Sequence, residues 1–119
     1  MRFASLGSGS RGNALVIESG ATRILVDCGF STRVTLTRLS RLGLAPEDID
    51  AVLVTHEHSD HLHGVAGFCG RFGIPVFLTH GTHIALPDAC GRLPEHRLID
   101  SHRPFAINDL HIQPFPVPH

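Results

Sequence analysis

The stretch VTHEHSDHLHG at residues 54–64 decides how this sequence of 119 residues is interpreted. It places four histidines and two carboxylates within eight positions. Residues 49–55 before and into it (IDAVLVT) are nearly continuous in apolar character, which is typical of a strand buried on both faces. The sequence therefore predicts a buried strand that delivers a histidine-rich segment to the edge of a sheet.

The spacing within this segment favours a metal site. His56 and His58 are two apart, so in extended backbone both imidazoles point the same way and can address one ion. Asp60 and His61 follow as the chain turns into a helix, where adjacent side chains diverge towards a second point. Such ligands suit Zn²⁺, with Mn²⁺ and Fe²⁺ as alternatives, and two ions would lie roughly 3.5–4 Å apart. The alternative is a solvated loop that is merely rich in histidine.

Composition limits the remaining possibilities. Ten histidines are the unusual feature, while the formal net charge of −1 gives no whole-chain sign of a nucleic acid or an acidic membrane as partner. The three cysteines, Cys28, Cys69 and Cys90, are widely spaced and form no CxxC pair, which favours a reducing compartment and hence the cytoplasm. No apolar run is long enough for a signal sequence or a membrane span, so we expect no membrane partner.

The order of predicted elements is that of one α/β domain over residues 1–119. Strands are expected at residues 2–6, 14–18, 23–27, 49–55, 75–79, 97–99, 105–107 and 110–115, and helices at 32–42, 62–72 and 82–86. Ser31 caps the first helix and Gly43 ends it, with Leu36, Leu39 and Leu42 on its inner side. Its arginines, Arg33, Arg38 and Arg41, are expected to face solvent rather than to form a binding stripe. The small residues of the second helix predict close packing against a neighbour.

One motif that matches by spacing is rejected. Residues 7–12 read GSGSRG, with Asp27 twenty residues after Gly7, which imitates a dinucleotide-binding fingerprint. That fingerprint needs a helix opening at the third glycine, whereas residues 14–27 are β-branched and are interrupted by Ser19-Gly20. A glycine-rich turn between strands is expected instead.

The motifs MRFASLGSGSRGN (1–13), ILVDCGFS (24–31), LVTHEHSDHLHGV (53–65) and PFPVPH (114–119) together resemble the YycJ-like branch of the metallo-β-lactamase-fold hydrolases. The likeness covers essentially the whole chain. It implies an αββα sandwich, a mixed sheet with flanking helices, with the metals at the open edge between two sheets. Carried over by position, the first metal would be held by His56, His58 and His119, and the second by Asp60 and His61.

The resemblance also shows where the sequence departs from the family pattern. In that pattern a bridging aspartate, a further histidine and a second half of the sandwich follow, and none of these lies within residues 1–119. We therefore expect the chain to be the N-terminal half of the sandwich, ending at its third metal motif, His119.

The implied activity is that of a metal-dependent hydrolase that uses a metal-activated hydroxide, with Asp60 orienting the nucleophile. The resemblance favours phosphodiester hydrolysis of DNA, in the manner of an exonuclease, so that nucleic acid would be the substrate. Two alternatives stay open: a thioester or lactam hydrolase of the same fold, or a metal-binding fragment that is catalytically incomplete.

The other polar residues receive weaker predictions. Asp27 resembles the early structural aspartate of the family, and it either hydrogen-bonds the metal loop or only shapes a turn. His63 either supports the ligands or lies on the surface. Glu57 is expected to point away from the ions by strand alternation. His80 and His83 border the site or lie on the surface, and three further histidines are expected to be exposed: His96, His102 and His111.

Overall fold

A computed structural model describes residues 1–7, 13–55, 59–79, 95–100 and 102–114, and for residues 59–63 it describes the backbone alone. Within these residues a six-stranded sheet runs in chain order. Its strands are β1 (Arg2–Gly7), β2 (Ala14–Ser19), β3 (Thr22–Val26), β4 (Ala51–Leu53), β5 (Val76–Thr79) and β6 (His96–Ile99). This sheet confirms the expected α/β class.

The direction of the strands changes at β3. Strands β1, β2 and β3 pair antiparallel, while β3, β4, β5 and β6 pair parallel. The β2–β3 pair is the predicted hairpin, and because residues 14–19 form a strand, the dinucleotide-binding helix is absent there as expected. In the parallel part the carboxyl ends of β3 and β4 meet at one edge. Asp27 after β3 and Thr55 beyond β4 therefore lie side by side.

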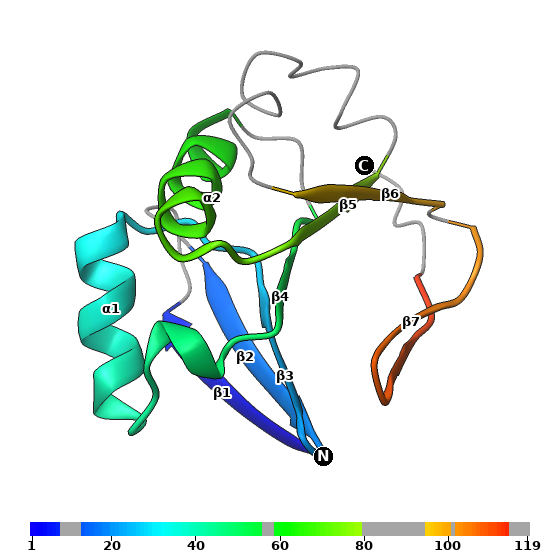
Figure 1. The fold of residues 1–119 in the computed structure, drawn as a ribbon, viewed down its shortest axis with the longest axis horizontal. Coiled ribbons are helices and arrows are strands. Elements are labelled where there is room, and N and C mark those ends of the chain that lie inside the picture. Colours follow the sequence, from blue (N-terminus) through cyan, green and yellow to red (C-terminus); the bar gives the residue numbers. More distant parts are fainter. Residues whose placement is uncertain (8–12, 56–58, 80–94, 101, 115–119) are drawn as a thin grey trace.

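Two α-helices, α1 (Thr32–Arg41) and α2 (Ser59–Phe72), cover one face of the sheet, and a short 3₁₀ helix, η1 (Pro46–Asp48), precedes β4 (Figure 1). The predicted cap of α1 is confirmed, since Ser31 Oγ accepts a hydrogen bond from Val34 N at 3.3 Å. Gly43, with φ +74°, ends the helix as predicted, and Leu44 N donates to Leu39 O.

The inner side of α1 differs from the prediction. Leu39 is fully buried and Leu36 is half-buried, but Leu42 is 43% exposed. The prediction for Leu42 was wrong because the helix ends at Arg41 and the capping residue no longer follows the buried face. Thr35, one turn before Leu39, occupies the buried face instead.

The three arginines of α1 also differ in their exposure to solvent. Arg33 and Arg41 are exposed, as expected, whereas Arg38 is half-buried. Its guanidinium lies 4.3 Å from the centre of the Phe30 ring, and Nη1 donates to Leu6 O at 2.5 Å. Arg38 therefore joins α1 to the end of β1 and to the segment after β3.

The segment around the histidine motif is arranged differently from the prediction in two respects. Strand β4 is shorter than residues 49–55, although Val54 N still donates to Phe77 O at 2.8 Å, so the extended backbone continues beyond Leu53. Helix α2 begins at Ser59 rather than at residue 62. The backbones of Asp60 and His61 consequently belong to the first turn of α2.

The sheet separates two groups of buried side chains. On the helical side Val52 and Val54 pack with residues such as Leu39 and Phe68. On the other side Ala51 and Leu53 pack against a second, two-stranded sheet, β7 (Phe105–Ile107) and β8 (Leu110–Ile112). The apolar run of β4 is thus buried on both faces, as predicted.

The β7–β8 hairpin turns where the sequence predicts it. Asn108 has φ +50°, a conformation that asparagine tolerates in tight turns. Strand β8 ends at Ile112, short of the expected end at residue 115, and residues 113–114 are described but not strand. The expected helix at residues 82–86 lies outside the described residues. Within the described part of the chain, no helix is long and apolar enough to cross a membrane.

Candidate metal centre

The turn after β3 holds the far end of β4 in place. Asp27 is buried and has φ +60°, and its backbone N donates to Leu53 O at 2.7 Å. One carboxylate oxygen accepts from Thr55 N at 2.9 Å, and the other accepts from Thr55 Oγ1 at 2.5 Å. Thr55 is the residue immediately before His56. The carboxylate therefore fixes the position from which the histidine motif departs.

Of the two roles predicted for Asp27, the structure shows the turn, and it adds a contact with Thr55, one residue before the motif. The residue adopts a left-handed turn conformation, and its side chain also hydrogen-bonds the chain just before the motif. Sequence reasoning had not identified Thr55 as the partner. The signal was its position, since it is the first polar residue after the apolar run of β4.

The other end of the motif is held by helix packing. A Cβ built on Gly64 would lie 2.9 Å from Phe30 O and 3.0 Å from Cys28 O, so α2 lies against the backbone of the segment after Asp27. This contact confirms the close packing expected for the helix, at Gly64. It does not extend evenly along the helix, because a Cβ on Gly67 would meet only Thr32 Oγ1, at 3.5 Å.

The side chains of all five predicted ligands lie outside the described part of the chain. His56, His58 and His119 lie outside the described residues, and so do the side chains of Asp60, His61 and His63. These assignments therefore stay predictions. Glu57, His80 and His83 also lie outside the described residues.

The described side chains offer no competing metal site. Among them, no group of three or more histidines, cysteines, aspartates or glutamates comes together in a way that could hold an ion. His96, His102 and His111 are exposed, as predicted. The donor set of the motif, three imidazoles and one carboxylate in positions 56–61, fits a borderline divalent ion such as Zn²⁺.

Two buried thiols lie in the core on the helical side of the sheet, and they add neither a metal ligand nor a nucleophile. Cys28 Sγ is 3.6 Å from Thr35 Oγ1, and burial raises the pKa of the Cys28 thiol above its ordinary value. Burial likewise raises the pKa of Cys69. Both thiols are therefore protonated near neutral pH, and neither is available as a nucleophile or as a thiolate ligand.

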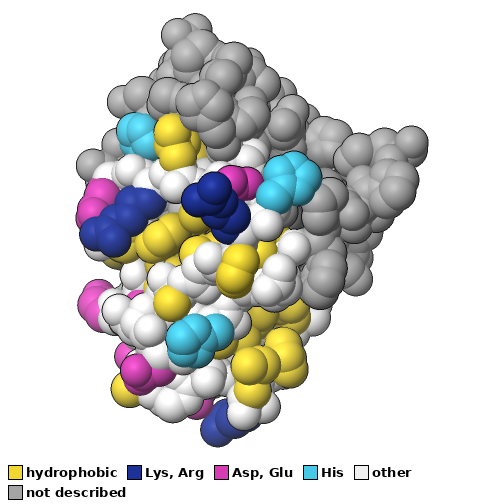
Figure 2. Space-filling view, turned by 90° about the vertical axis from the view of Figure 1, so that its right-hand side faces the viewer, with side chains coloured by type: hydrophobic (Ala, Val, Ile, Leu, Met, Phe, Trp, Pro, Cys, Tyr) yellow, Lys and Arg dark blue, Asp and Glu magenta, His cyan; other side chains and the backbone are white. Residues whose placement is uncertain are grey.

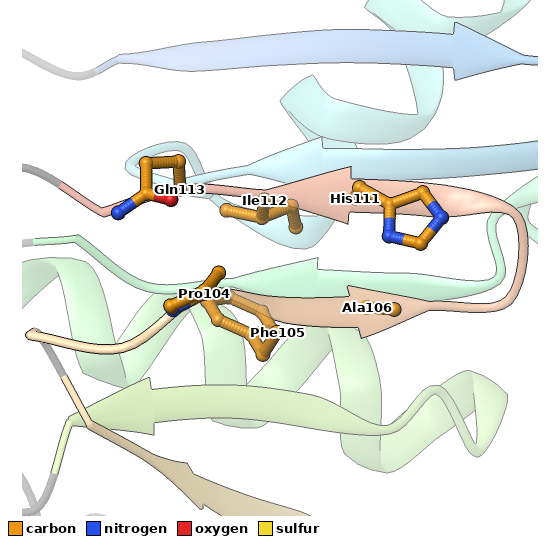
Figure 3. A pocket seen from close by; sticks show the side chains of 6 residues that line it. All are labelled: Pro104, Phe105, Ala106, His111, Ile112 and Gln113. Atoms are coloured by element: carbon orange, nitrogen blue, oxygen red, sulfur yellow. The ribbon is translucent and has the colours of Figure 1, made fainter.

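A surface hollow of about 390 Å³ lies on the β7–β8 hairpin (Figure 3). Its described lining is mostly apolar. The lining residues are Pro104, Phe105, Ala106, His111, Ile112 and Gln113.

The charges on this side of the molecule are mixed in sign. Figure 2 shows cationic side chains beside acidic ones rather than a continuous basic track. Arg97 pairs with Glu95 at 3.3 Å and Arg103 pairs with Asp100 at 3.5 Å. The described part of this face therefore carries little unbalanced positive charge.

Comparison with known proteins gives a consistent result. The profile of the family described as the Metallo-beta-lactamase superfamily matches residues 7–115. Exodeoxyribonuclease WalJ of Streptococcus pneumoniae is 31% identical over 122 aligned residues, which cover 99% of this chain and 45% of that protein. Exodeoxyribonuclease YycJ of Bacillus anthracis is 34% identical over 94 residues, which cover 79% of this chain and 36% of that protein. The chain thus spans less than half the length of these relatives.

Solved structures agree on the fold. A B3 metallo-beta-lactamase with an active-site glutamic acid aligns with a TM-score of 0.72 at 21% identity, covering 88% of this chain and 45% of that one. At this identity the likeness concerns the fold alone. Because the family profile matches most of the sequence and two relatives exceed 30% identity, the chain belongs to the metallo-β-lactamase superfamily, whose members include metal-dependent hydrolases.

Proposed function

We propose that this chain contributes His56, His58, Asp60, His61 and His119 to a two-metal site, in a hydrolase that cleaves phosphodiester bonds of DNA. The observation that carries the proposal is the placement of the HxHxDH motif. It begins directly after Thr55, which Asp27 clamps, and it continues into the first turn of α2. A metal site needs ligands that are fixed before the ion arrives, and both ends of this segment are anchored to the fold.

The proposed division of labour follows the spacing of the motif. His56, His58 and His119 hold one ion, while Asp60 and His61 hold the other. When bound, the divalent metals make a water molecule nucleophilic near neutral pH and stabilise the charge that develops on the phosphodiester. Asp60 orients that nucleophile, and Asp27 and His63 support the ligands. We propose Zn²⁺ as the metal, with Mn²⁺ and Fe²⁺ as alternatives that metal analysis distinguishes.

The substrate class rests on the relatives. The two described above are both named exodeoxyribonucleases, and a ribonuclease Z of Bradyrhizobium diazoefficiens is 38% identical over 83 residues, 66% of this chain and 27% of that protein. All three names denote hydrolysis of phosphodiester bonds in nucleic acid. The exodeoxyribonucleases match more of the chain, which favours DNA.

The surface charge limits where DNA would bind. The described arginines at the β6 edge are paired with carboxylates, so they offer little attraction to phosphate. We therefore propose that the principal contacts with DNA phosphates are made at the metal site. We also propose a cytoplasmic location, supported by the buried free thiols of Cys28 and Cys69.

The test combines metal analysis with a nuclease assay. The wild-type chain, His58→Ala, Asp60→Ala and a control, His111→Ala, are loaded with Zn²⁺ or Mn²⁺ and dialysed. Bound metal is then counted by mass spectrometry. We expect about two ions per wild-type chain, and the loss of at least one ion in each motif variant. His111 is exposed on β8, so His111→Ala should bind as the wild type does.

The same proteins are then incubated with end-labelled DNA and with a thioester and a β-lactam. Release of mononucleotides by wild type, lost in both motif variants, supports the proposal. Bound metal without turnover would support a catalytically incomplete chain instead, and turnover of the thioester or the lactam alone would overturn the choice of DNA. If wild type and the motif variants bind equally little metal, the central idea fails.

A further inference from the structure

We infer that Gly64 is a positioning residue for the metal motif, because one short segment, residues 27–30, fixes both ends of the stretch that carries it. We call this segment the platform. The inference rests on the proposed metal-binding function and goes beyond it. It assigns a task to a residue that is not itself a ligand.

The platform makes its first contact through Asp27. Its carboxylate receives both the backbone N–H and the hydroxyl of Thr55, at 2.9 and 2.5 Å. This pair of hydrogen bonds sets where the chain leaves the sheet, one residue before His56.

The second contact is made by the backbone of Cys28 and Phe30. The carbonyl oxygens of Cys28 and Phe30 face α2 at Gly64, where a Cβ would stand 3.0 and 2.9 Å from them. Real Cβ atoms essentially never approach another atom closer than 3.0 Å. Glycine at position 64 therefore allows α2 to lie directly on the platform, three and four residues after His61 and Asp60.

The platform is itself held by its surroundings and has little freedom to yield. Gly29 N donates to Asn13 O at 2.9 Å, and the buried Cys28 thiol lies against Thr35 of α1. The Phe30 ring lies beneath the Arg38 guanidinium, which also binds Leu6 O. The platform is thus tied to α1, to the end of β1 and to the start of β2.

A side chain at position 64 must consequently move the helix rather than the platform. The obstructing atoms are backbone oxygens, which cannot rotate away as the end of a flexible side chain can. Helix α2 would shift outward, and its first turn with it, while Thr55 stayed clamped by Asp27. The distance between the two halves of the motif would change, and its ligands would no longer converge on the same ions.

Gly67 provides a matched control on the same helix. It is exposed, and a Cβ there would lie 3.5 Å from Thr32 Oγ1, which is ordinary van der Waals contact. Alanine has a higher helix propensity than glycine at both positions, so propensity alone predicts the same effect for Gly64→Ala and Gly67→Ala. Only the contact with the platform distinguishes the two variants.

The experiment titrates the full 119-residue chain with Co²⁺ and follows the visible absorption of the ion, which reports the geometry of its ligands. Unfolding by urea in the presence of a chelator is measured in parallel. We expect Gly64→Ala to bind Co²⁺ at least about 10-fold more weakly than wild type and with an altered spectrum. Gly67→Ala should keep the wild-type affinity and spectrum.

If Gly64→Ala alone does not fold, the double variant Gly64→Ala/Gly67→Ala is used instead. Its second alanine adds helix stability. Weak binding by this folded double variant supports the inference. Wild-type affinity and spectrum in Gly64→Ala, with Co²⁺ bound by wild type, would overturn the inference and leave the proposed function intact. Failure of wild type to bind Co²⁺, Zn²⁺ or Mn²⁺ would overturn the proposed function, and the inference with it.

Discussion

The two faces of the six-stranded sheet differ in how many apolar side chains they bury, and the helical face buries more of them. On the helical face, side chains from α1, α2 and the sheet close into a continuous core in which Leu39, Val52 and Phe68 have almost no exposure. On the opposite face, the β7–β8 hairpin buries Ile107 and Leu110, while other apolar side chains around them stay partly exposed. The half-buried group consists of Ile17, Val26, Ile99, Phe105 and Ile112.

The difference shows which part of the fold supports the predicted metal motif. The motif leaves β4 at Thr55 and enters α2, and both anchors of this segment, Asp27 and Gly64, lie against the densely packed helical layer. A well-packed layer transmits a small displacement instead of absorbing it. The helical face is thus the one on which substitutions should reach the motif, whereas substitutions under the hairpin should remain local.

The largest expected effect comes from Phe68→Ala. Phe68 is fully buried on the helical face and its ring lies 5.4 Å from that of Phe72. Removing it leaves a cavity between α2 and the sheet, and we expect the free energy of unfolding to fall by about 3–5 kcal/mol. Urea denaturation followed by circular dichroism measures the change.

The same substitution on the opposite face is the control. Phe105 is half-buried and stacks on Phe77 with ring centres 6.3 Å apart, so Phe105→Ala should cost roughly 1–2 kcal/mol. Equal losses for the two phenylalanines would show that the hairpin face is packed as firmly as the helical face, and the comparison would fail.

A smaller loss of stability is expected from the substitution of Asp27, whose carboxylate binds Thr55. Asp27→Ala removes both acceptors of Thr55 and leaves an alanine at φ +60°, so we expect the free energy of unfolding to fall by about 2–3 kcal/mol. Metal affinity should fall as well, because Thr55 precedes the motif. Thermal unfolding and metal titration measure the two effects separately.

Asp27→Asn tests whether the loss of stability comes from the lost hydrogen bonds of Asp27 or from its lost negative charge. Asparagine tolerates the left-handed conformation, and its amide can still pair with the N–H and the hydroxyl of Thr55, so most of the stability should return. If asparagine proved as damaging as alanine, the negative charge of Asp27, rather than its hydrogen-bond geometry, would be the required property.

Much of this arrangement could be predicted from local sequence patterns. The β2–β3 hairpin, the Ser31 cap, the Gly43 terminus and the Asn108 turn each depend on a few adjacent residues with strong conformational preferences. The buried strand before the motif was equally clear, because both faces of β4 are covered and its residues are continuously apolar.

The contacts that matter most for the site were harder to predict because they join distant segments. The partner of Asp27 is 28 residues away, and the neighbour of Gly64 is the backbone of Cys28 and Phe30, which leaves no pattern of its own in the sequence. The glycine-rich composition of α2 indicates that another segment packs closely against the helix, but it does not identify that segment. The half-buried position of Arg38 was missed for the same reason, since its partners lie on β1 and after β3.

The smallest expected effect is a pH dependence of stability, which reports whether water reaches the buried side chains of the helical face. Burial raises the pKa of Cys69, so the thiol stays protonated in the folded chain while it ionises in the unfolded chain above its ordinary pKa of about 8.5. This contribution to stability is fully present below that pH and is lost as the pH rises above it. Between pH 7.5 and 9 the loss should be less than about 1 kcal/mol, and Cys69→Ala should remove that part of the slope. Urea denaturation of both proteins at the two pH values measures the difference. An unchanged slope in Cys69→Ala would mean that water reaches the thiol, and that the helical layer is less tightly closed than its packing implies.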